Sequence, residues 1–134
     1  MILLSIAAAC LLDQDGRLLL VRKRGTHAFM LPGGKLEPGE SAIAGLLREL
    51  HEELHLNLPS DRLQPLGNFR APAANEADTE IQAQVFIAAL PHTVAPAAEL
   101  EELRWHCPAS HDSDDLAPLL QLHVLPRLRE LTRG

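Results

Sequence analysis

Residues 32–54 read PGGKLEPGESAIAGLLRELHEEL, a glycine-rich loop followed by a segment with helical periodicity. Ser41 is the expected N-cap, because its hydroxyl can accept a hydrogen bond from a free amide of the first helical turn. Beyond Ser41, aliphatic residues recur every three or four positions and form one apolar stripe: Ile43, Leu46, Leu47, Leu50 and Leu54. The stretch therefore predicts a loop that leads into an amphipathic helix packed against a core.

An acidic cluster lies away from this stripe. Glu49, Glu52 and Glu53 stand at positions i, i+3 and i+4 of the predicted helix, where like charges repel by a few tenths of a kcal/mol per pair. A cation would remove the repulsion, and carboxylate oxygens suit a hard ion such as Mg²⁺ or Mn²⁺. Arg48 beside the cluster and Glu40 before the helix can form a bidentate pair that fixes the loop against the helix.

The glycines of the loop add a place for phosphate. They let the backbone come close to a metal and to a bound phosphate. Such a metal would neutralise a diphosphate, lower the pKa of a bound water and orient this water on phosphorus. The alternative interpretation is a solvated acidic helix face and a plain turn. The combination of loop, arginine and three glutamates favours a metal–phosphate site.

The spacing of these residues resembles that of the Nudix family, whose box is GX5EX7REUXEEXGU, with U a bulky aliphatic residue. The matching positions are Gly34, Glu40, Arg48, Glu49, Leu50, Glu52, Glu53 and Leu56. His55 departs from the pattern, because the family has glycine there. A non-glycine residue in the left-handed conformation costs about 1–2 kcal/mol, so either the helix ends differently or His55 bears this strain.

The resemblance implies an α/β fold, an α/β/α sandwich with a mixed β-sheet between helices. It also implies hydrolysis of a pyrophosphate bond in a nucleoside diphosphate derivative, with Mg²⁺ or Mn²⁺ as cofactor. The implied metal ligands are Glu49, Glu52 and Glu53, together with the backbone carbonyl of Gly33, and one of the glutamates would also act as general base. Arg48 would take part in catalysis, and Gly34 and Glu40 would orient the cluster.

Candidates outside the box come from both sides of it. In many members of the family a carboxylate from a later loop assists the metal, for which Glu99 is the first candidate and Glu102 the second. Basic residues near the site would give the positive potential that a polyphosphate needs, unless they form a solvated rim. They are Arg22, Lys23, Arg24 and Lys35, of which Arg22, Arg24 and Lys35 are the candidates for substrate binding. A nucleoside triphosphate and an ADP-sugar are equally compatible substrates, and Pro72 lies at about the place where ADP-ribose enzymes carry a proline.

Three other functions compete with this interpretation. One is a non-catalytic nucleotide-sensing module on the same fold, and another is an isomerase on that fold. The third is a zinc peptidase, because residues 51–55 read HEELH and so contain the H-E-x-x-H pattern. On a helix, however, His51 and His55 lie on one flank of the apolar stripe while Glu49 and Glu53 lie on the other. One metal ion cannot use both sets.

Composition limits the class of protein. The 134 residues are 46% apolar and 22% charged, which suits a single domain over residues 1–134. A net charge of −6 argues against nucleic acid and anionic membranes as partners. The family resemblance implies a small-molecule substrate. Two cysteines cannot form a disulfide scaffold, and Cys10 is expected in the core of a cytoplasmic protein. A homodimer is compatible with the family resemblance.

Strands are expected on both sides of the helix. The apolar run Ile2–Leu12 is interpreted as a buried strand and not as a signal peptide, since no basic residue precedes it. Residues 24–40 are expected to form a loop. Further strands are predicted at 17–23, 63–71, 79–90 and 100–107. A C-terminal helix is predicted with Asp112 or Ser113 as its cap, and with Pro118 and Pro126 interrupting or delimiting it.

Overall fold

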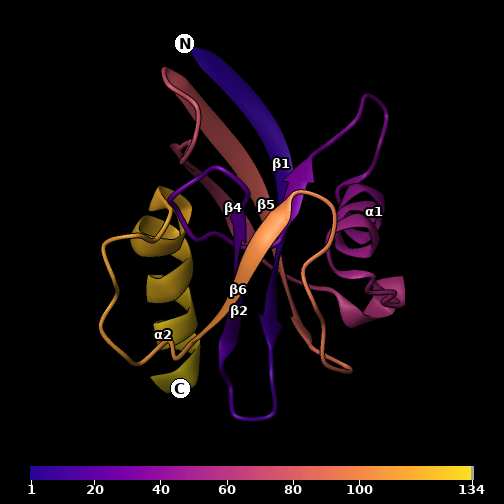
Figure 1. Ribbon diagram of the computed structural model, residues 1–134, viewed down its shortest axis with the longest axis vertical. Coiled ribbons are helices and arrows are strands. Elements are labelled where there is room, and N and C mark those ends of the chain that lie inside the picture. Colours follow the sequence, from indigo (N-terminus) through magenta and orange to yellow (C-terminus); the bar gives the residue numbers. More distant parts are fainter. Residues whose placement is uncertain (134) are drawn as a thin grey trace.

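The computed structural model describes residues 1–133 and shows one sheet with a helix on each side (Figure 1). The strands are β1 (Ile2–Leu12), β2 (Leu18–Lys23), β3 (Gly33–Lys35), β4 (Gln64–Pro72), β5 (Thr79–Ala89) and β6 (Leu100–His106). The helices are α1 (Ala42–Leu54), the 3₁₀ turn η1 (Ser60–Arg62), the π-helical turn η2 (Leu120–Val124) and α2 (Leu125–Arg133). No helix in this range is long and apolar enough to cross a membrane.

The sheet is mixed, as expected. Its strand order is β4-β5-β1-β2-β6, and β3 pairs with β1 outside this order. The central strand β1 runs parallel to β5 over its whole length, whereas it pairs antiparallel with β2 at Leu12 and with β3 at residues 6–8. The long β1 therefore carries β3, and with it the glycine-rich loop, at its middle.

The two faces of the sheet bury two separate apolar cores. Ala7, Ala9 and Leu11 of β1 pack on the side of α1, and the intervening Ala8 and Cys10 pack on the side of the C-terminal helix. Helix α1 contributes Leu46, Leu50 and Leu54 to one core. The C-terminal helix contributes buried residues to the other, namely Leu120, Val124, Leu125 and Leu128. Full burial of each such side chain stabilises the folded protein by roughly 1.5–3 kcal/mol. The α/β/α sandwich and the buried position of Cys10 are thus confirmed.

Two expectations about local structure are wrong. The predicted loop at residues 24–40 contains the short strand β3. Gly33 pairs with Ala8 in the ladder, and a side chain at Gly33 would collide with the Ala7 carbonyl oxygen. Consecutive glycines carry no strand signal in a sequence, because glycine is depleted in strands.

The cap expected for the C-terminal helix is also wrong. Asp112 and Ser113 precede the helix and bind elsewhere, Asp112 to Arg129 (2.7 Å) and Ser113 to Asp115. The helical segment begins at Pro118. At the first turn of a helix the missing amide hydrogen of proline costs no hydrogen bond, because amides there have no partner within the helix. Pro126 follows the turn η2, in which the Leu125 amide donates to the Leu120 carbonyl five residues back. It therefore interrupts the regular helix without ending it.

Candidate functional site

Helix α1 has the cap predicted for it and an unusual end. The Ser41 hydroxyl oxygen accepts a hydrogen bond from the Ala44 amide at 3.1 Å. At the other end His55 adopts the left-handed conformation, with φ 51° and ψ 35°. The amides of His55 and Leu56 donate back to the carbonyls of His51 and Leu50, the pattern of a glycine-type helix end. Of the two alternatives for His55, the structure shows that it bears the strain.

Arg48 ties the loop to the helix through Glu40. Its Nε and Nη2 donate to the two oxygens of Glu40, each at 2.9 Å, while Nη2 also reaches the Lys35 carbonyl at 3.2 Å. The hydrogen bonds from Arg48 to Glu40, and a further one from the Glu37 amide, lower the pKa of Glu40 to about 2. A Cβ at Gly45 would lie 2.8 Å from Glu40 Oε1, which explains a glycine inside the helix.

The two glycines of the loop contact two glutamates, Gly34 by leaving space for Glu49 and Gly33 through its amide. A Cβ at Gly34 would lie 2.5 Å from the carboxyl carbon of Glu49, so any larger residue would displace this carboxylate. The Gly33 amide donates to Glu53 Oε1 at 3.3 Å. Both glycines thus lie against the glutamates, and the predicted approach of this backbone to a metal and a phosphate stays a prediction.

Glu53 is the buried member of the cluster. Its side chain is only 5% exposed. Burial raises its pKa to about 7, with smaller contributions from the charges of Glu49 and Glu99; the Gly33 amide and the Lys23 ammonium act in the opposite direction. A carboxyl group with one long hydrogen bond in such surroundings needs a proton or a cation.

The three glutamates fit a hard divalent ion by their chemistry, but they are not preassembled around one point. Arg48 Nη1 lies 2.8 Å from Glu49 Oε1 and 3.7 Å from Glu52 Oε1, while Glu53 turns to Gly33. Within residues 1–133 no three acidic, histidine or cysteine side chains already form a metal cluster. The donor set, consisting only of oxygen atoms and including the under-coordinated Glu53, is the one that Mg²⁺ or Mn²⁺ prefers.

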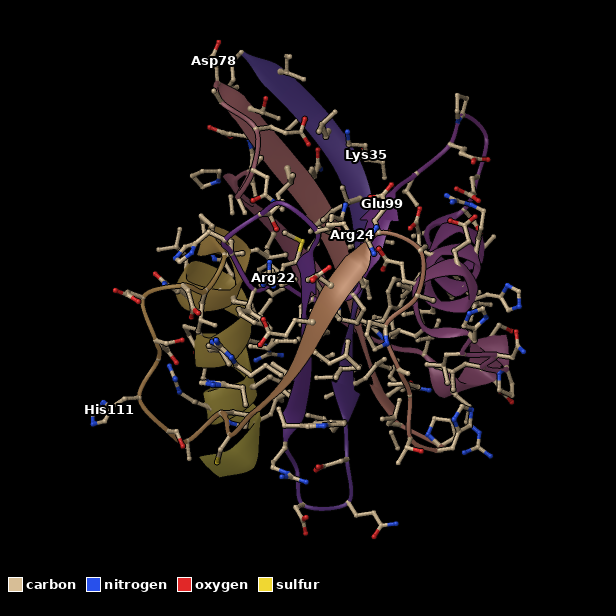
Figure 2. The ribbon with its side chains drawn as sticks, in the orientation of Figure 1. Arg22, Arg24, Lys35, Asp78, Glu99 and His111 are labelled. Atoms are coloured by element: carbon tan, nitrogen blue, oxygen red, sulfur yellow. The ribbon has the colours of Figure 1, made fainter. Side chains whose placement is uncertain are left out.

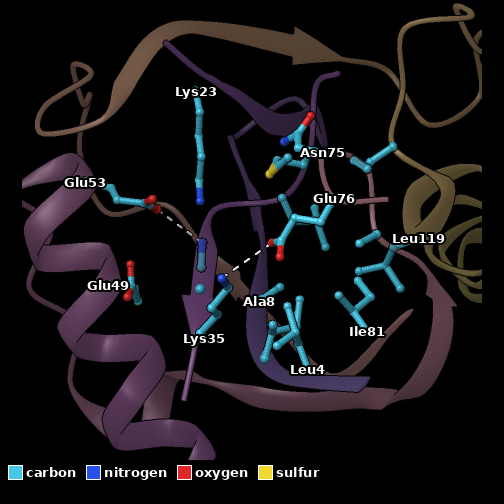
Figure 3. A pocket seen from close by; sticks show the side chains of 18 of the residues that line it. Leu4, Ala8, Lys23, Lys35, Glu49, Glu53, Asn75, Glu76, Ile81 and Leu119 are labelled. Carbon is cyan, nitrogen blue, oxygen red and sulfur yellow. Dashed lines mark hydrogen bonds and ion pairs between the residues drawn. The ribbon is translucent and has the colours of Figure 1, made fainter. Parts of the chain in front are cut away.

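These side chains form one end of a cavity of about 350 Å³ (Figure 3), a volume that suits a small-molecule ligand. The charged and polar end is lined by Lys23, Gly33, Gly34, Lys35, Glu49, Glu52, Glu53 and Glu99. The other end is lined mainly by aliphatic residues of β1, β5 and the start of the C-terminal helical segment, among them Leu4, Ile6, Ala8, Ile81, Leu119 and Leu120. Pro72, Asn75 and Glu76 also line the cavity.

Glu99, the first candidate outside the box, lies in the cavity wall. Its carbonyl accepts from the Arg24 amide at 2.8 Å, and the Ala97 amide donates to the Glu53 carbonyl at 2.8 Å, so backbone hydrogen bonds hold this loop against α1 and β2. Lys23 Nζ lies 3.9 Å from Glu99 Oε2. Glu102, the second candidate, instead pairs with Arg22 at 3.1 Å and does not line the cavity.

The structure separates the three basic candidates (Figure 2). Lys35 lines the cavity. Arg22 and Arg24 do not line it; they pair with Glu102 and with Glu101 at 3.1 and 3.2 Å. Sequence reasoning did not assign Asn75 and Glu76, because a short polar loop between two strands carries no signal for a site.

The two histidines of the H-E-x-x-H pattern lie outside this cavity, whereas its glutamate, Glu52, lines it. His51 and His55 are both exposed, and their ring centroids are 6.3 Å apart in an edge-to-face arrangement. Neither lines the cavity. Glu53 turns from them toward Gly33, which separates the imidazoles from the buried carboxylate.

Known proteins resemble nearly the whole chain. A family model described as the NUDIX domain matches residues 3–128. An uncharacterized Nudix hydrolase of Bacillus subtilis, YvcI, is 30% identical over 99 residues, which make up 72% of this chain and 62% of that protein. An RNA pyrophosphohydrolase of Erwinia tasmaniensis is 37% identical over 51 residues, or 38% of this chain and 29% of that protein. The chain thus spans less than two thirds of the length of either relative.

The fold is also found in solved structures. The crystal structure of a MutT protein from Methanosarcina mazei matches 99% of this chain and 97% of its own, with a TM-score of 0.79 and 20% identity. At this identity the match shows the fold alone, and this fold agrees with the sandwich described above.

Proposed function

The chain belongs to the Nudix family, and from that premise we propose that it hydrolyses a pyrophosphate bond in a nucleoside diphosphate derivative. The observation that carries this proposal is the position of the three glutamates. Glu49, Glu52 and Glu53 lie at the polar end of a cavity large enough for a nucleotide-sized ligand. The loop before them is fixed by the Arg48–Glu40 pair.

The proposed cofactor is Mg²⁺ or Mn²⁺, held by Glu49, Glu52 and Glu53, with the Gly33 carbonyl and Glu99 as further candidate ligands. When bound, such an ion offsets phosphate charge and lowers the pKa of a bound water. It would also supply the positive charge that the buried Glu53 lacks. Proton loss from Glu53 would accompany metal binding near neutral pH, since its pKa is about 7.

The other residues bind and orient. Lys35 and Lys23 line the cavity beside the glutamates and place ammonium groups where a phosphate would lie. Arg48 keeps Glu40 and Glu49 in place through hydrogen bonds of 2.8–2.9 Å. Gly34 leaves the space that the Glu49 carboxylate fills. These contacts set the geometry in which a water molecule would attack phosphorus.

Both substrate types remain in the proposal. The name of the Erwinia relative, an RNA pyrophosphohydrolase, supports cleavage of a pyrophosphate bond, which both substrate types contain. The position of Pro72 in the cavity wall supports an ADP-sugar. A screen of nucleoside triphosphates and ADP-sugars with Mg²⁺ or Mn²⁺, with the products identified by chromatography, distinguishes them. Nucleotide binding without any product would favour the sensing module instead.

Glu52→Gln tests the site. Its side chain is 54% exposed and makes no close hydrogen bond, so the variant should fold like the parent, as checked by circular dichroism. Loss of one charged oxygen ligand should lower kcat at least a hundredfold. Glu130→Gln, which removes a carboxylate from the surface of α2, is the matched control and should retain full activity. An unchanged rate in Glu52→Gln would rule out the proposed metal site.

A further inference from the structure

One ion pair lies where the charged end of the cavity meets its aliphatic end. Lys35 Nζ lies 3.5 Å from Glu76 Oε1, and both residues line the cavity. Lys35 belongs to β3, whereas Glu76 belongs to the loop between β4 and β5. Figure 3 shows the pair in the middle of the cavity, with Glu53 on one side and Leu119 on the other. A ligand that fills the cavity must therefore pass this pair.

Charge in the cavity is unfavourable for a phosphate on its own. The lining contains five glutamates and two lysines. Each lysine already faces an acid from a different loop, Lys35 from Glu76 at 3.5 Å and Lys23 from Glu99 at 3.9 Å. A phosphate that approaches Lys35 competes with a carboxylate that is part of the wall.

The aliphatic end has no cation to offer. Leu4, Ile6, Ile81 and Leu119 form it, and Asn75 is a polar, uncharged side chain that also lines the cavity. A phosphate placed there would lose water without gaining a counter-charge, which is strongly unfavourable. An uncharged organic group would meet no such penalty, and the Asn75 amide could both donate and accept a hydrogen bond.

We propose that Glu76 competes with substrate phosphate for the Lys35 ammonium, and that it thereby determines the direction in which the substrate lies. Phosphates occupy the end at α1, and an uncharged organic group, such as a nucleoside or sugar, occupies the aliphatic end. Glu76 is thus a specificity-determining residue at the boundary. This inference rests on the proposed function, because it assumes that the ligand carries a diphosphate.

Glu76→Gln tests the competition. It removes the charge and preserves the shape of a side chain that is 46% exposed, so the fold should not change. The probes are methylenediphosphonate, whose P–C–P bridge cannot be hydrolysed, and adenosine, which has no charge. Both are titrated calorimetrically in Mg²⁺. Methylenediphosphonate should bind Glu76→Gln about twofold to fivefold more tightly at low salt, and the gain should shrink at high salt. Adenosine should bind parent and variant equally.

Two comparisons separate this role from a general charge effect. Glu130→Gln changes the net charge by the same amount on α2, outside the cavity lining, and should leave the binding of methylenediphosphonate unchanged. In a Lys35→Met background, Glu76→Gln should no longer tighten binding, since the ammonium for which the two groups compete is gone.

The outcomes separate failure of the role proposed for Glu76 from failure of the proposed pyrophosphate hydrolysis. No tightening in Glu76→Gln, equal tightening in Glu130→Gln, or tightening that persists without Lys35 would each overturn the role of Glu76. Failure of adenosine to bind the parent would overturn the assignment of the aliphatic end to the organic group. Failure of methylenediphosphonate to bind any variant in Mg²⁺ would contradict the proposed function itself.

Discussion

Glu53 is a carboxyl group whose surroundings disfavour its ionised form. It is 5% exposed, and one amide at 3.3 Å is its hydrogen-bond donor. Neighbouring carboxylates add to the effect of burial, so its pKa rises to about 7. A carboxyl group with a raised pKa stabilises the fold at low pH and loses this contribution as the pH rises through the folded value. Without a cation, the protein therefore keeps a destabilising charge at the centre of its candidate site.

Glu53→Gln should separate stability from function. In chelator at pH 8 the variant should be more stable than the parent by roughly 1–3 kcal/mol, because a neutral amide replaces a buried carboxylate. At pH 4, below the ordinary pKa of 4.5 for a glutamate in the unfolded chain, this difference should nearly vanish. Thermal unfolding followed by circular dichroism at the two pH values measures it.

Glu52→Gln provides the comparison, because its side chain is 54% exposed and its loss should leave stability unchanged at both pH values. Both variants should lose hydrolytic activity. Equal stability of Glu53→Gln and the parent at pH 8 would contradict the raised pKa.

At the scale of elements, α1 carries most of the candidate site and ends under strain. His55 occupies the left-handed region at φ 51°, where the family pattern has glycine. Its imidazole is exposed, and the His51 ring lies 6.3 Å away by centroids. The hydrogen bonds of this helix end come from backbone amides, so they do not depend on the side chain.

His55→Gly should therefore stabilise the protein. Glycine adopts the left-handed conformation without steric penalty, and the gain should be about 0.5–1 kcal/mol. The same replacement four residues earlier, His51→Gly, lies inside the helix and should lower stability by about the same amount. Thermal unfolding of the two variants gives opposite shifts of Tm if the helix ends as described. A fall in Tm for His55→Gly would show that its side chain makes a contact worth more than the strain.

How well elements could be predicted depended on whether their signal was local. Apolar patterns predicted five strands and the stripe of α1. The observed ends of these strands lie within about one residue of the predicted ends, for β1, β2, β4, β5 and β6. The spacing of Arg48 and Glu40 likewise indicated a pair before the structure showed it. By contrast, β3 exists because β1 lies beside Gly33, and Glu76 reaches Lys35 from a distant loop. Contacts of this kind leave no mark in a single sequence.

At the scale of the molecule, the aliphatic wall of the cavity depends on one junction between distant segments. Arg104 of β6 forms a bidentate pair with Asp115, at 2.8 and 2.9 Å, and its guanidinium lies 3.7 Å from the ring centroid of Phe29. The Phe29 amide donates to the Asp115 carbonyl, and the Ala117 amide donates to the Phe29 carbonyl. The chain then enters the helical segment that supplies Leu119 to the cavity. The junction thus holds this wall against the sheet.

Arg104→Met should weaken this junction in a pH-dependent way. Above pH 4 the loss should be about 1–2 kcal/mol, since a partly buried bidentate pair and a cation–π contact disappear together. Arg104 and Ser113 hold the pKa of Asp115 down to about 2. The carboxylate therefore contributes stability that is present above its unfolded pKa and is lost as the pH falls toward 2. The difference between parent and variant should narrow over this range.

Thermal unfolding between pH 5 and pH 2 measures this narrowing, with Arg127→Met as the control. Arg127 pairs with Glu130 three residues away on the exposed face of α2, where an ion pair contributes about 0–1 kcal/mol. Its loss should be small at every pH. Because the junction lies beyond the aliphatic end and not at the glutamates, Arg104→Met should raise KM more than it lowers kcat. A variant whose stability deficit does not change from pH 5 to pH 2 would show that Phe29 stacking, rather than the Asp115 pair, holds the wall.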